Sequence, residues 1–220
     1  MLVPVCVFAK PALPGQAKTR LAPILGKAGA ASLASAMLMD VWRTVTACPG
    51  VQPILAAAGL GPFPVTGAEI WLQGDGDLGA RIQAIIQRAL RMSPVAIAIG
   101  ADTPALKQIH LQSALDALSQ RDAVMGRCSD GGFYLLAMKA CPVGLFSNLP
   151  WSTPETADAV LARLHQHGMS VSEIEPLFDV DCKEDLVRLS ELFRREPSLA
   201  PATRQALQQL ACASASSFPL

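Results

Sequence analysis

The sequence predicts a single-domain α/β fold in which helices cover both faces of a mostly parallel but mixed sheet. Strand-like apolar runs alternate with helical patterns along the 220 residues, which is typical of a doubly wound sheet. The run 95–99 is apolar throughout, as expected for a strand covered on both faces. Only residues 129–132 separate two strand-like runs, so this return is too short for a crossover helix and one strand must be antiparallel.

The individual elements follow from apolar runs and helical patterns that are bounded by turn residues. The apolar run 3–8 predicts the first strand, and the Ala-rich segment 27–45 predicts a long helix. Further strands are predicted at 52–58, 69–72, 95–100, 123–127, 133–138 and 171–175. Further helices are predicted at 78–92, 109–119, 154–167, 184–194 and 202–211. Residues 1–211 therefore form one expected domain, and the Ser/Ala-rich residues 212–220 are expected to form a flexible tail.

The composition is that of a compact protein without a global electrostatic field. Apolar residues make up 51% of the chain and charged residues 16%, which excludes extended disorder. Eighteen basic residues balance eighteen acidic ones, so neither nucleic acid nor an anionic membrane is favoured as a partner. No apolar stretch is expected to span a membrane, and the first residues lack the basic region of a signal peptide. We therefore expect a cytoplasmic protein.

A cationic loop directly after the first strand is the strongest functional signal. Lys10, Lys18 and Arg20 lie in this loop, at the carboxyl end of a strand, where ligands of α/β sheets bind. Arg and Lys side chains there suit a diphosphate, although a solvated basic loop is the simpler alternative. A P-loop would need glycine at positions 12 and 17, and both are alanine.

Two aspartates are candidate metal ligands. Asp102 follows the most apolar strand of the chain, so the sheet delivers it to the edge that faces the cationic loop. Asp181 precedes a predicted helix, and Asp179 would share its face if the segment is extended. One or two carboxylates together with substrate phosphates are the usual ligands of Mg²⁺. Asp102 and Asp181 could instead be helix caps.

Taken together, these segments resemble the DUF2064 family of glycosyltransferase-like proteins, which have the GT-A (nucleotide-diphospho-sugar transferase) fold. The matching stretches are residues 9–23, 76–81, 99–104, 129–136, 151–153, 179–181 and 184–186. They follow the family's order and cover nearly the whole chain. The chain departs from the family at Gly126-Arg127-Cys128-Ser129, where Gly-Pro is usual before the Asp-Gly-Gly motif, and at Phe133, where Tyr is usual.

The resemblance implies roles for particular residues. It makes Asp102 and Asp181 the ligands of Mg²⁺ or Mn²⁺. The implied nucleotide-binding residues are Phe8, Ala9, Lys10, Gly15, Lys18, Thr19, Arg20, Gln73, Leu78, Gly79 and Asp102. The implied acceptor-side residues are Asp130, Gly131, Gly132, Trp151, Ser152 and Thr153. The implied catalytic residues are Asp102, Asp130, Lys18 and Arg20. Core packing is an equally good explanation of Trp151, and His110, His165 and His167 are expected at the surface.

Three functions fit such a site. The first is transfer of a sugar from a nucleotide-diphospho-sugar donor to a small-molecule acceptor. The second is nucleotidyl transfer with release of pyrophosphate, because the chain also resembles 2-phospholactate guanylyltransferases and, more weakly, molybdenum-cofactor guanylyltransferases. The third is non-catalytic binding of a nucleotide sugar, since a fold does not fix a function. Self-association into a homodimer stays open.

Overall fold

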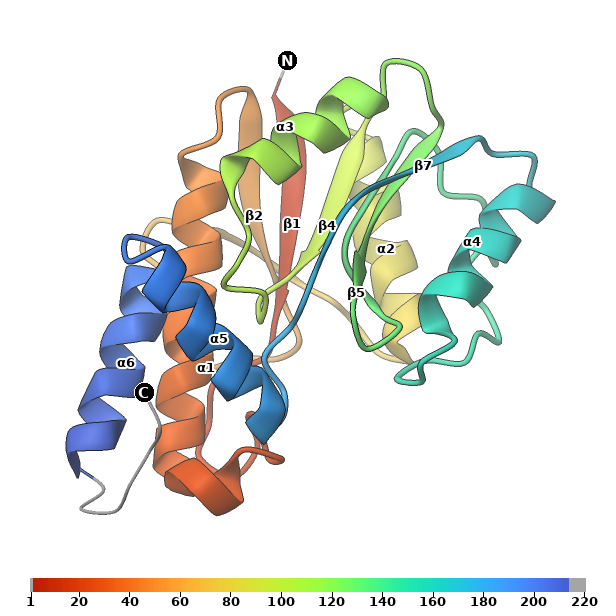
Figure 1. Ribbon diagram of the computed structural model, residues 1–220. Helices are drawn as coiled ribbons and strands as arrows, with labels where there is room; N and C mark the ends of the chain where they lie inside the picture. Colours follow the sequence, from red (N-terminus) through yellow and green to blue (C-terminus); the bar gives the residue numbers. More distant parts are fainter. Residues whose placement is uncertain (1, 214–220) are drawn as a thin grey trace.

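A seven-stranded sheet runs through the middle of the molecule in the computed structural model, which describes residues 2–213 (Figure 1). Its strand order is β3-β2-β1-β4-β6-β5-β7. The strands are β1 Val3–Ala9, β2 Val51–Ala57, β3 Glu69–Leu72, β4 Ala96–Gly100, β5 Ala123–Cys128, β6 Phe133–Met138 and β7 Val171–Leu177. The helices are α1 Ala22–Thr46, α2 Leu78–Leu90, α3 Gln108–Ala117, α4 Thr156–Gln166, α5 Lys183–Arg195 and α6 Pro201–Ala213.

Strand β6 is antiparallel to both of its neighbours, and every other pair in the sheet is parallel. The mixed sheet with one antiparallel strand is therefore confirmed. Strands β1, β4 and β5 all run in one direction, so their carboxyl ends lie at the same edge of the sheet. The short turn between β5 and β6 lies at that edge as well.

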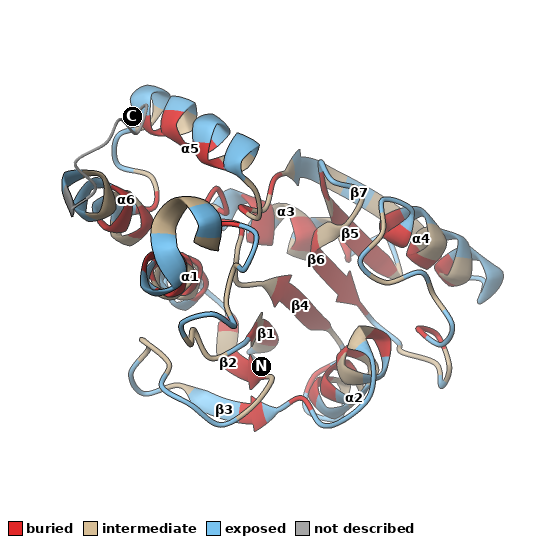
Figure 2. Cartoon of the chain, turned by 90° about the horizontal axis from the view of Figure 1, so that it is seen from below, coloured by how far each residue is buried: buried red, intermediate tan, exposed pale blue. Residues whose placement is uncertain are grey.

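Helices cover both faces of the sheet, as predicted. On one face, α1 and α3 pack on the sheet through a core that includes Val41 and Leu111. On the other face, α2 and α4 pack through a core that includes Ile86 and Val160. Helices α5 and α6 lie outside α1, where Leu33 joins them in a third core (Figure 2).

Helix α1 bends near its start because Gly26 has φ 71°, which is outside the helical region. The predicted helix 27–45 is the part that follows this bend. By length and composition, α1 could also cross a membrane, although half of its most apolar window is buried inside the protein. The expectation that no apolar stretch is long enough to span a membrane is thus wrong for α1. The buried core helix of a folded domain gives the same signal.

The other predicted elements agree with the structure to within about two residues at each end, which is the usual uncertainty of helix and strand ends. Strand β7 extends to Leu177, beyond the predicted end at 175, because it continues to pair with β5. Helix α6 extends to Ala213, so the first two residues of the predicted tail are helical. Residues 214–220 lie outside the described part of the chain.

A buried carboxylate on α1 accepts hydrogen bonds from the first turn of α6, the last helix. Asp40 on α1 is only 4% exposed and accepts hydrogen bonds from the backbone N–H groups of Ala202 and Thr203, at 3.1 and 2.7 Å. The Thr203 hydroxyl donates to the same carboxylate at 2.7 Å. Asp40 thus satisfies N–H groups that the first turn of α6 would otherwise leave without partners.

We expect Asp40→Ala to lower the free energy of unfolding by about 2–3 kcal/mol, because the helix loses its cap and buried donors lose their acceptor. Asp40→Asn should cost less, since its amide oxygen still accepts. The control is Asp116→Ala on the exposed surface of α3, which should change stability by less than about 0.5 kcal/mol. Urea unfolding measures all three variants, and equal stability of Asp40→Ala and the wild type would contradict the role assigned to Asp40.

Candidate active site

The candidate site lies at the sheet edge where β1, β4 and β5 end. Figure 2 looks onto this edge of the molecule. The cationic loop follows β1, Asp102 follows β4, and Asp130 lies in the turn after β5. The segment with Asp179 and Asp181 follows β7 and leads into α5. Four stretches that are far apart in the sequence therefore converge here.

The side chain of Lys18 joins two of these stretches. Its ammonium Nζ lies 2.8 Å from Oδ2 of Asp102 and 3.0 Å from Oδ1 of Asp181. The two carboxylate oxygens are consequently within about 6 Å of each other, inside the roughly 10 Å that one shared ion and its bound waters could bridge. Arg20 contacts the other oxygen of Asp181 at 3.2 Å. The structure thus brings together the predicted metal ligands and two of the predicted phosphate-binding side chains.

The backbone of the cationic loop is shaped so that Lys18 points inward. Leu21, at the end of the loop, is fully buried in the core between α1 and α5 and anchors the loop there. Lys18 itself has φ 45° in the left-handed region, which is rare and costly for a residue with a side chain. Gly15 also has a positive φ, of 80°. Because of this turn, the Lys18 side chain is only 10% exposed, whereas Arg20 is 76% exposed.

The segment with Asp181 is held against β4 by its backbone. The N–H of Val180 donates to the carbonyl of Asp102 at 3.0 Å. Helix α5 begins after the N-cap residue Cys182, and Asp185 accepts the N–H groups of Asp181 and Cys182 at 2.9 and 2.8 Å. Asp181 is therefore not the cap, and its carboxylate is turned toward Lys18 and Arg20.

Asp102 does not cap a helix either. Helix α3 begins six residues later, after the N-cap residue Lys107, and the Asp102 carboxylate contacts Lys18 instead. Burial disfavours the charged form of Asp102, but the ammonium of Lys18 and its hydrogen bond outweigh that cost and hold the pKa of the carboxyl below its usual value. Burial likewise opposes the charge of Lys18, but the two carboxylates raise its pKa above the usual value. This part of the site is an ionised cluster at neutral pH.

A second acidic group lies beside the first. One potential ligand atom each from Cys128, Asp130 and Asp179 lies within 4.8 Å of the other two. Burial, together with the negative charges of Asp102 and Asp130, raises the pKa of Asp179 to about 7. Burial also raises the pKa of the Cys128 thiol, so this residue is neutral at physiological pH. The alternation Asp179-Val180-Asp181 indicated that Asp179 could share a face with Asp181, but nothing near Cys128 indicated its place in this group.

The turn with Asp130 contacts the start of α4, which directly follows the other predicted acceptor-side segment. The carboxylate of Asp130 accepts the N–H of Gly132 at 2.9 Å, which closes the turn between β5 and β6. The carbonyl of Gly131 accepts the N–H of Ala157 in α4 at 2.9 Å. A Cβ at Gly131 would lie only 1.9 Å from the carbonyl oxygen of Pro154, so only glycine fits there. Residues 151–153 lead into the same end of α4.

Trp151 packs against its neighbours while one polar atom stays without a partner. Its ring makes edge or tilted contacts with Phe133 and Phe146, at centroid distances of 6.4 and 6.2 Å. Its indole N–H is buried without a hydrogen-bond partner in the described structure. A Cβ at Gly79 would come within 2.8 Å of the indole, so this glycine is needed for packing. Ser152 has φ 62° and is exposed.

The remaining predicted nucleotide-binding residues differ in how open they are to a ligand. Gln73 is 4% exposed, donates to the carbonyl of Ala56 at 2.7 Å and accepts from Arg81 at 3.4 Å, so its amide is occupied within the protein. Ala9 is buried, and Phe8 and Leu78 are partly buried against the core of the α2 face. The more accessible side chains are those of Lys10 and Thr19, both exposed.

One histidine prediction is wrong. His110 is 4% exposed, not a surface residue, because α3 packs against β5 and β7. Its Nδ1 accepts the N–H of Lys107 at 3.0 Å, and its Nε2 lies 3.4 Å from Glu175. It also contacts the ring of Tyr134 edge-on. His165 and His167 are exposed, as predicted.

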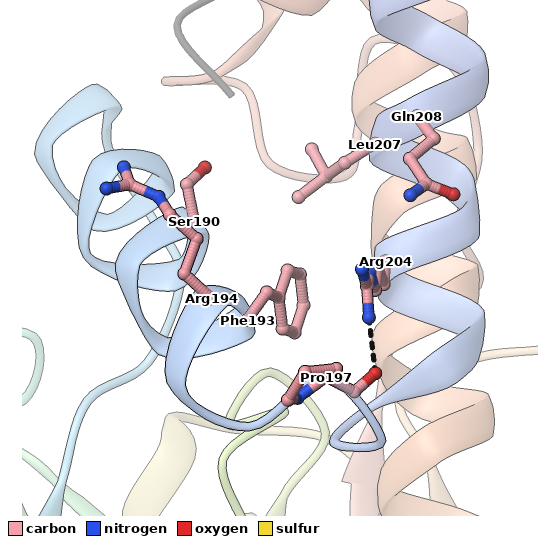
Figure 3. A pocket seen from close by; sticks show the side chains of 7 residues that line it. All are labelled: Ser190, Phe193, Arg194, Pro197, Arg204, Leu207 and Gln208. Atoms are coloured by element: carbon pink, nitrogen blue, oxygen red, sulfur yellow. Dashed lines mark hydrogen bonds between the residues drawn. The ribbon is translucent and has the colours of Figure 1, made fainter.

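A separate hollow of about 260 Å³ lies between α5 and α6 (Figure 3). Phe193 from α5 and Leu207 from α6 line it, and Arg204 donates to the carbonyl of Pro197 at its edge. The described residues that line it include no carboxylate and none of the predicted site residues. We therefore assign the functional site to the charged cluster at the sheet edge and not to this hollow.

The charged cluster has the chemistry of a divalent metal site. Two carboxylates from separate segments converge on one point, and a positive charge, the Lys18 ammonium, already lies between them. Carboxylate oxygens are the ligands that Mg²⁺ and Mn²⁺ prefer. The chemistry of Asp102 and Asp181 therefore fits such an ion, and their assignment as metal ligands stays a prediction.

The family resemblance inferred from the sequence motifs is confirmed. The pattern of the DUF2064 family, described as uncharacterized proteins conserved in bacteria, matches residues 36–153, more than half of the chain. No curated protein sequence matches significantly.

Solved structures share the fold. A protein from Desulfovibrio desulfuricans G20, provisionally named a nucleotide-diphospho-sugar transferase, has a TM-score of 0.86 and 21% identity, covering 96% of this chain and 98% of its own. A CMP:2-keto-3-deoxy-manno-octonic acid synthetase complexed with CTP has a TM-score of 0.56 and 16% identity, covering 89% and 100%. Rv0371c from Mycobacterium tuberculosis H37Rv, in complex with manganese, has a TM-score of 0.53 and 17% identity, covering 87% and 99%. The predicted GT-A fold is therefore confirmed.

The raised pKa of Asp179 predicts how stability depends on pH. An aspartate that ionises near pH 3.8 in the unfolded chain and near 7 in the folded protein lowers stability progressively as the pH rises through this interval. Asp179→Asn removes this penalty. We therefore expect the melting temperature of the variant, relative to the wild type, to rise from pH 4 to pH 7 and then level off. The melts are run with a chelator present. A difference that is constant across this range would show that Asp179 ionises normally.

Proposed function

Since the chain belongs to the DUF2064 family, we propose that it is a metal-dependent transferase with a nucleotide-activated donor, and that it transfers a sugar from a nucleotide-diphospho-sugar to a small-molecule acceptor. The observation that carries this proposal is the convergence of Asp102, Asp181 and Lys18 at the carboxyl edge of the sheet. That edge is where open α/β sheets bind their ligands. We place the reaction in the cytoplasm.

The residues of the site divide into two groups by charge. Asp102 and Asp181 would hold Mg²⁺ or Mn²⁺, and a bound ion neutralises the negative charge of a donor diphosphate. Lys10, Lys18 and Arg20 extend from the loop beside them and offer hydrogen-bond donors to phosphate oxygens. The exposed position of Arg20 suits a planar two-pronged contact with a ligand that arrives from solvent.

The charge on the acceptor side favours a sugar or another hydroxyl compound as the acceptor. Asp130 and Asp179 lie next to each other there, and a phosphorylated acceptor would be repelled by the charge of the pair, although Asp179, with a pKa of about 7, is only partly ionised at neutral pH. Arg188 reaches the hydroxyl of Ser129 at 2.7 Å, but it lies at the exposed rim of the turn. Glycosyl transfer needs no phosphate on the acceptor, whereas nucleotidyl transfer to a phosphorylated compound does.

Nucleotidyl transfer is the second candidate, in which a phosphorylated acceptor attacks the α-phosphate of a nucleoside triphosphate and pyrophosphate leaves. The position of the cationic loop, directly after β1, favours it. The likeness to a CMP:2-keto-3-deoxy-manno-octonic acid synthetase that was solved with CTP also supports it at the level of the fold. A binding protein without catalysis is the third candidate.

One assay separates the three candidates. The purified protein is incubated with Mn²⁺ or Mg²⁺, a panel of nucleotide sugars and nucleoside triphosphates, and a panel of hydroxyl and phosphorylated acceptors. Release of a nucleoside diphosphate from a nucleotide sugar supports glycosyl transfer, and release of pyrophosphate supports nucleotidyl transfer. If ligands raise the melting temperature but no product forms with any acceptor, the protein is a binder.

We expect Asp102→Asn to lower metal-dependent turnover by more than about a hundredfold, since even residues that only orient metal ligands affect metal affinity or activity by ten- to hundredfold. The amide still accepts a hydrogen bond from Lys18, so the melting temperature without metal should change little. Asp181→Ser should behave in the same way. Asp116→Asn on the far surface of α3 serves as the control with full turnover. Retained activity of Asp102→Asn at saturating metal would remove this residue from the metal site.

We expect Arg20→Ala to weaken nucleotide binding by about 1–3 kcal/mol, the value of a charge-assisted hydrogen bond. Binding of the corresponding unphosphorylated nucleoside should barely change, because Arg20 is assigned to the phosphates. Calorimetric titrations of the wild type and the variant with both ligands measure the two effects. Equal losses for the nucleoside and the nucleotide would mean that Arg20 does not contact phosphate.

A further inference from the structure

The ammonium of Lys18 occupies the point between Asp102 and Asp181 at which a shared metal ion would bind. We propose that Lys18 keeps divalent metal out of this position until a nucleotide binds, so that metal enters together with the nucleotide and not before it. This inference rests on the proposed use of a nucleotide donor. It concerns the order of binding, which neither the family nor the fold assigns.

The geometry makes the two cations mutually exclusive. Lys18 Nζ is 2.8 and 3.0 Å from one oxygen of each carboxylate. A metal ion that is bound by the same two oxygens, at about 2.1 Å from each, would lie almost on top of the ammonium. The ammonium has to leave before both carboxylates can bind one ion.

In the absence of a ligand, the surroundings of Lys18 favour its position between the two carboxylates. Its side chain is 10% exposed, whereas both carboxylates are 40% exposed. If the ammonium left alone, two adjacent carboxylates would keep only Arg20, which pairs with Asp181, and the more distant charge of Lys10. Leaving this position would cost the ammonium two charge-assisted hydrogen bonds at once.

Charge balance explains why a nucleotide would release Lys18. Among the four groups in direct contact, the two carboxylates are matched by the positive charges of Lys18 and Arg20. A divalent cation that enters alone would leave an excess of positive charge. A nucleotide diphosphate adds two or more negative charges and supplies oxygens to which the ammonium and the guanidinium can donate. Simultaneous entry of metal and nucleotide keeps the site near neutral, whereas entry of the metal alone does not.

The test measures Mn²⁺ binding to the folded protein without any nucleotide, from the loss of the electron paramagnetic resonance signal of free Mn²⁺. We expect weak binding to the wild type and roughly tenfold or tighter binding to Lys18→Met, whose side chain is of similar length but uncharged. Lys18→Met combined with Asp181→Asn should lose this gain. The matched control is Lys10→Met, which removes an exposed charge that acts on Asp102 from a distance, and it should change the affinity by less than about threefold.

Either of two results would overturn the proposal: wild-type protein that binds Mn²⁺ as tightly as Lys18→Met, or an equal gain in Lys10→Met. Lys18→Gln replaces the Met variant if the latter fails to fold. In the wild type, the rate at which an amine-acylating reagent modifies Lys18, measured by peptide mass spectrometry, should be unchanged by Mn²⁺ alone. A faster rate would mean that metal displaces Lys18 without a nucleotide. Because these readouts measure metal binding and not turnover, they can succeed even if the transferase assay finds no reaction.

Discussion

The parallel alignment of β1 and β4 is the constraint on which the candidate site depends. Because the two strands are neighbours that run in one direction, the loop after β1 and the aspartate after β4 must emerge side by side. The backbone hydrogen bond from the N–H of Val180 to the carbonyl of Asp102 then brings the segment that contains Asp181 to the same place. The ion pairs of Lys18 therefore follow from the order of the strands, although 163 positions separate Lys18 from Asp181.

The sequence predicted the fold and the meeting of the main charged residues because both follow from patterns that are local or topological. The apolar runs located the strands, and the four-residue turn after β5 required an antiparallel neighbour. Because the strands that precede Lys18, Asp102 and Asp181 run in one direction, all three residues had to lie at the carboxyl edge of the sheet. Their contacts are now observed, while their roles in metal and nucleotide binding remain predictions.

Other features could not be predicted because they depend on packing between elements. Cys128 and Asp179 meet only because β5 and β7 are adjacent, and their local sequence does not indicate that these strands pair. The burial of His110 depends on which side of α3 faces the sheet. The hydrogen bonds of the Gln73 amide with the carbonyl of Ala56 and with Arg81 also depend on packing, and its predicted role in nucleotide binding stays a prediction. Each of these outcomes is decided by a partner that is distant in the sequence.

The turn between β5 and β6 has a consequence for how the proposed acceptor preference could change over evolution. Two contacts constrain its few residues. The carboxylate of Asp130 closes the turn, and Gly131 lies against Pro154 with no room for a side chain. An insertion would separate the turn from α4 and disturb the pairing of β5 with β6. New acceptor preferences are therefore expected to arise by exchange of side chains around a backbone of constant length, whereas the exposed loop after β1 can also vary in length.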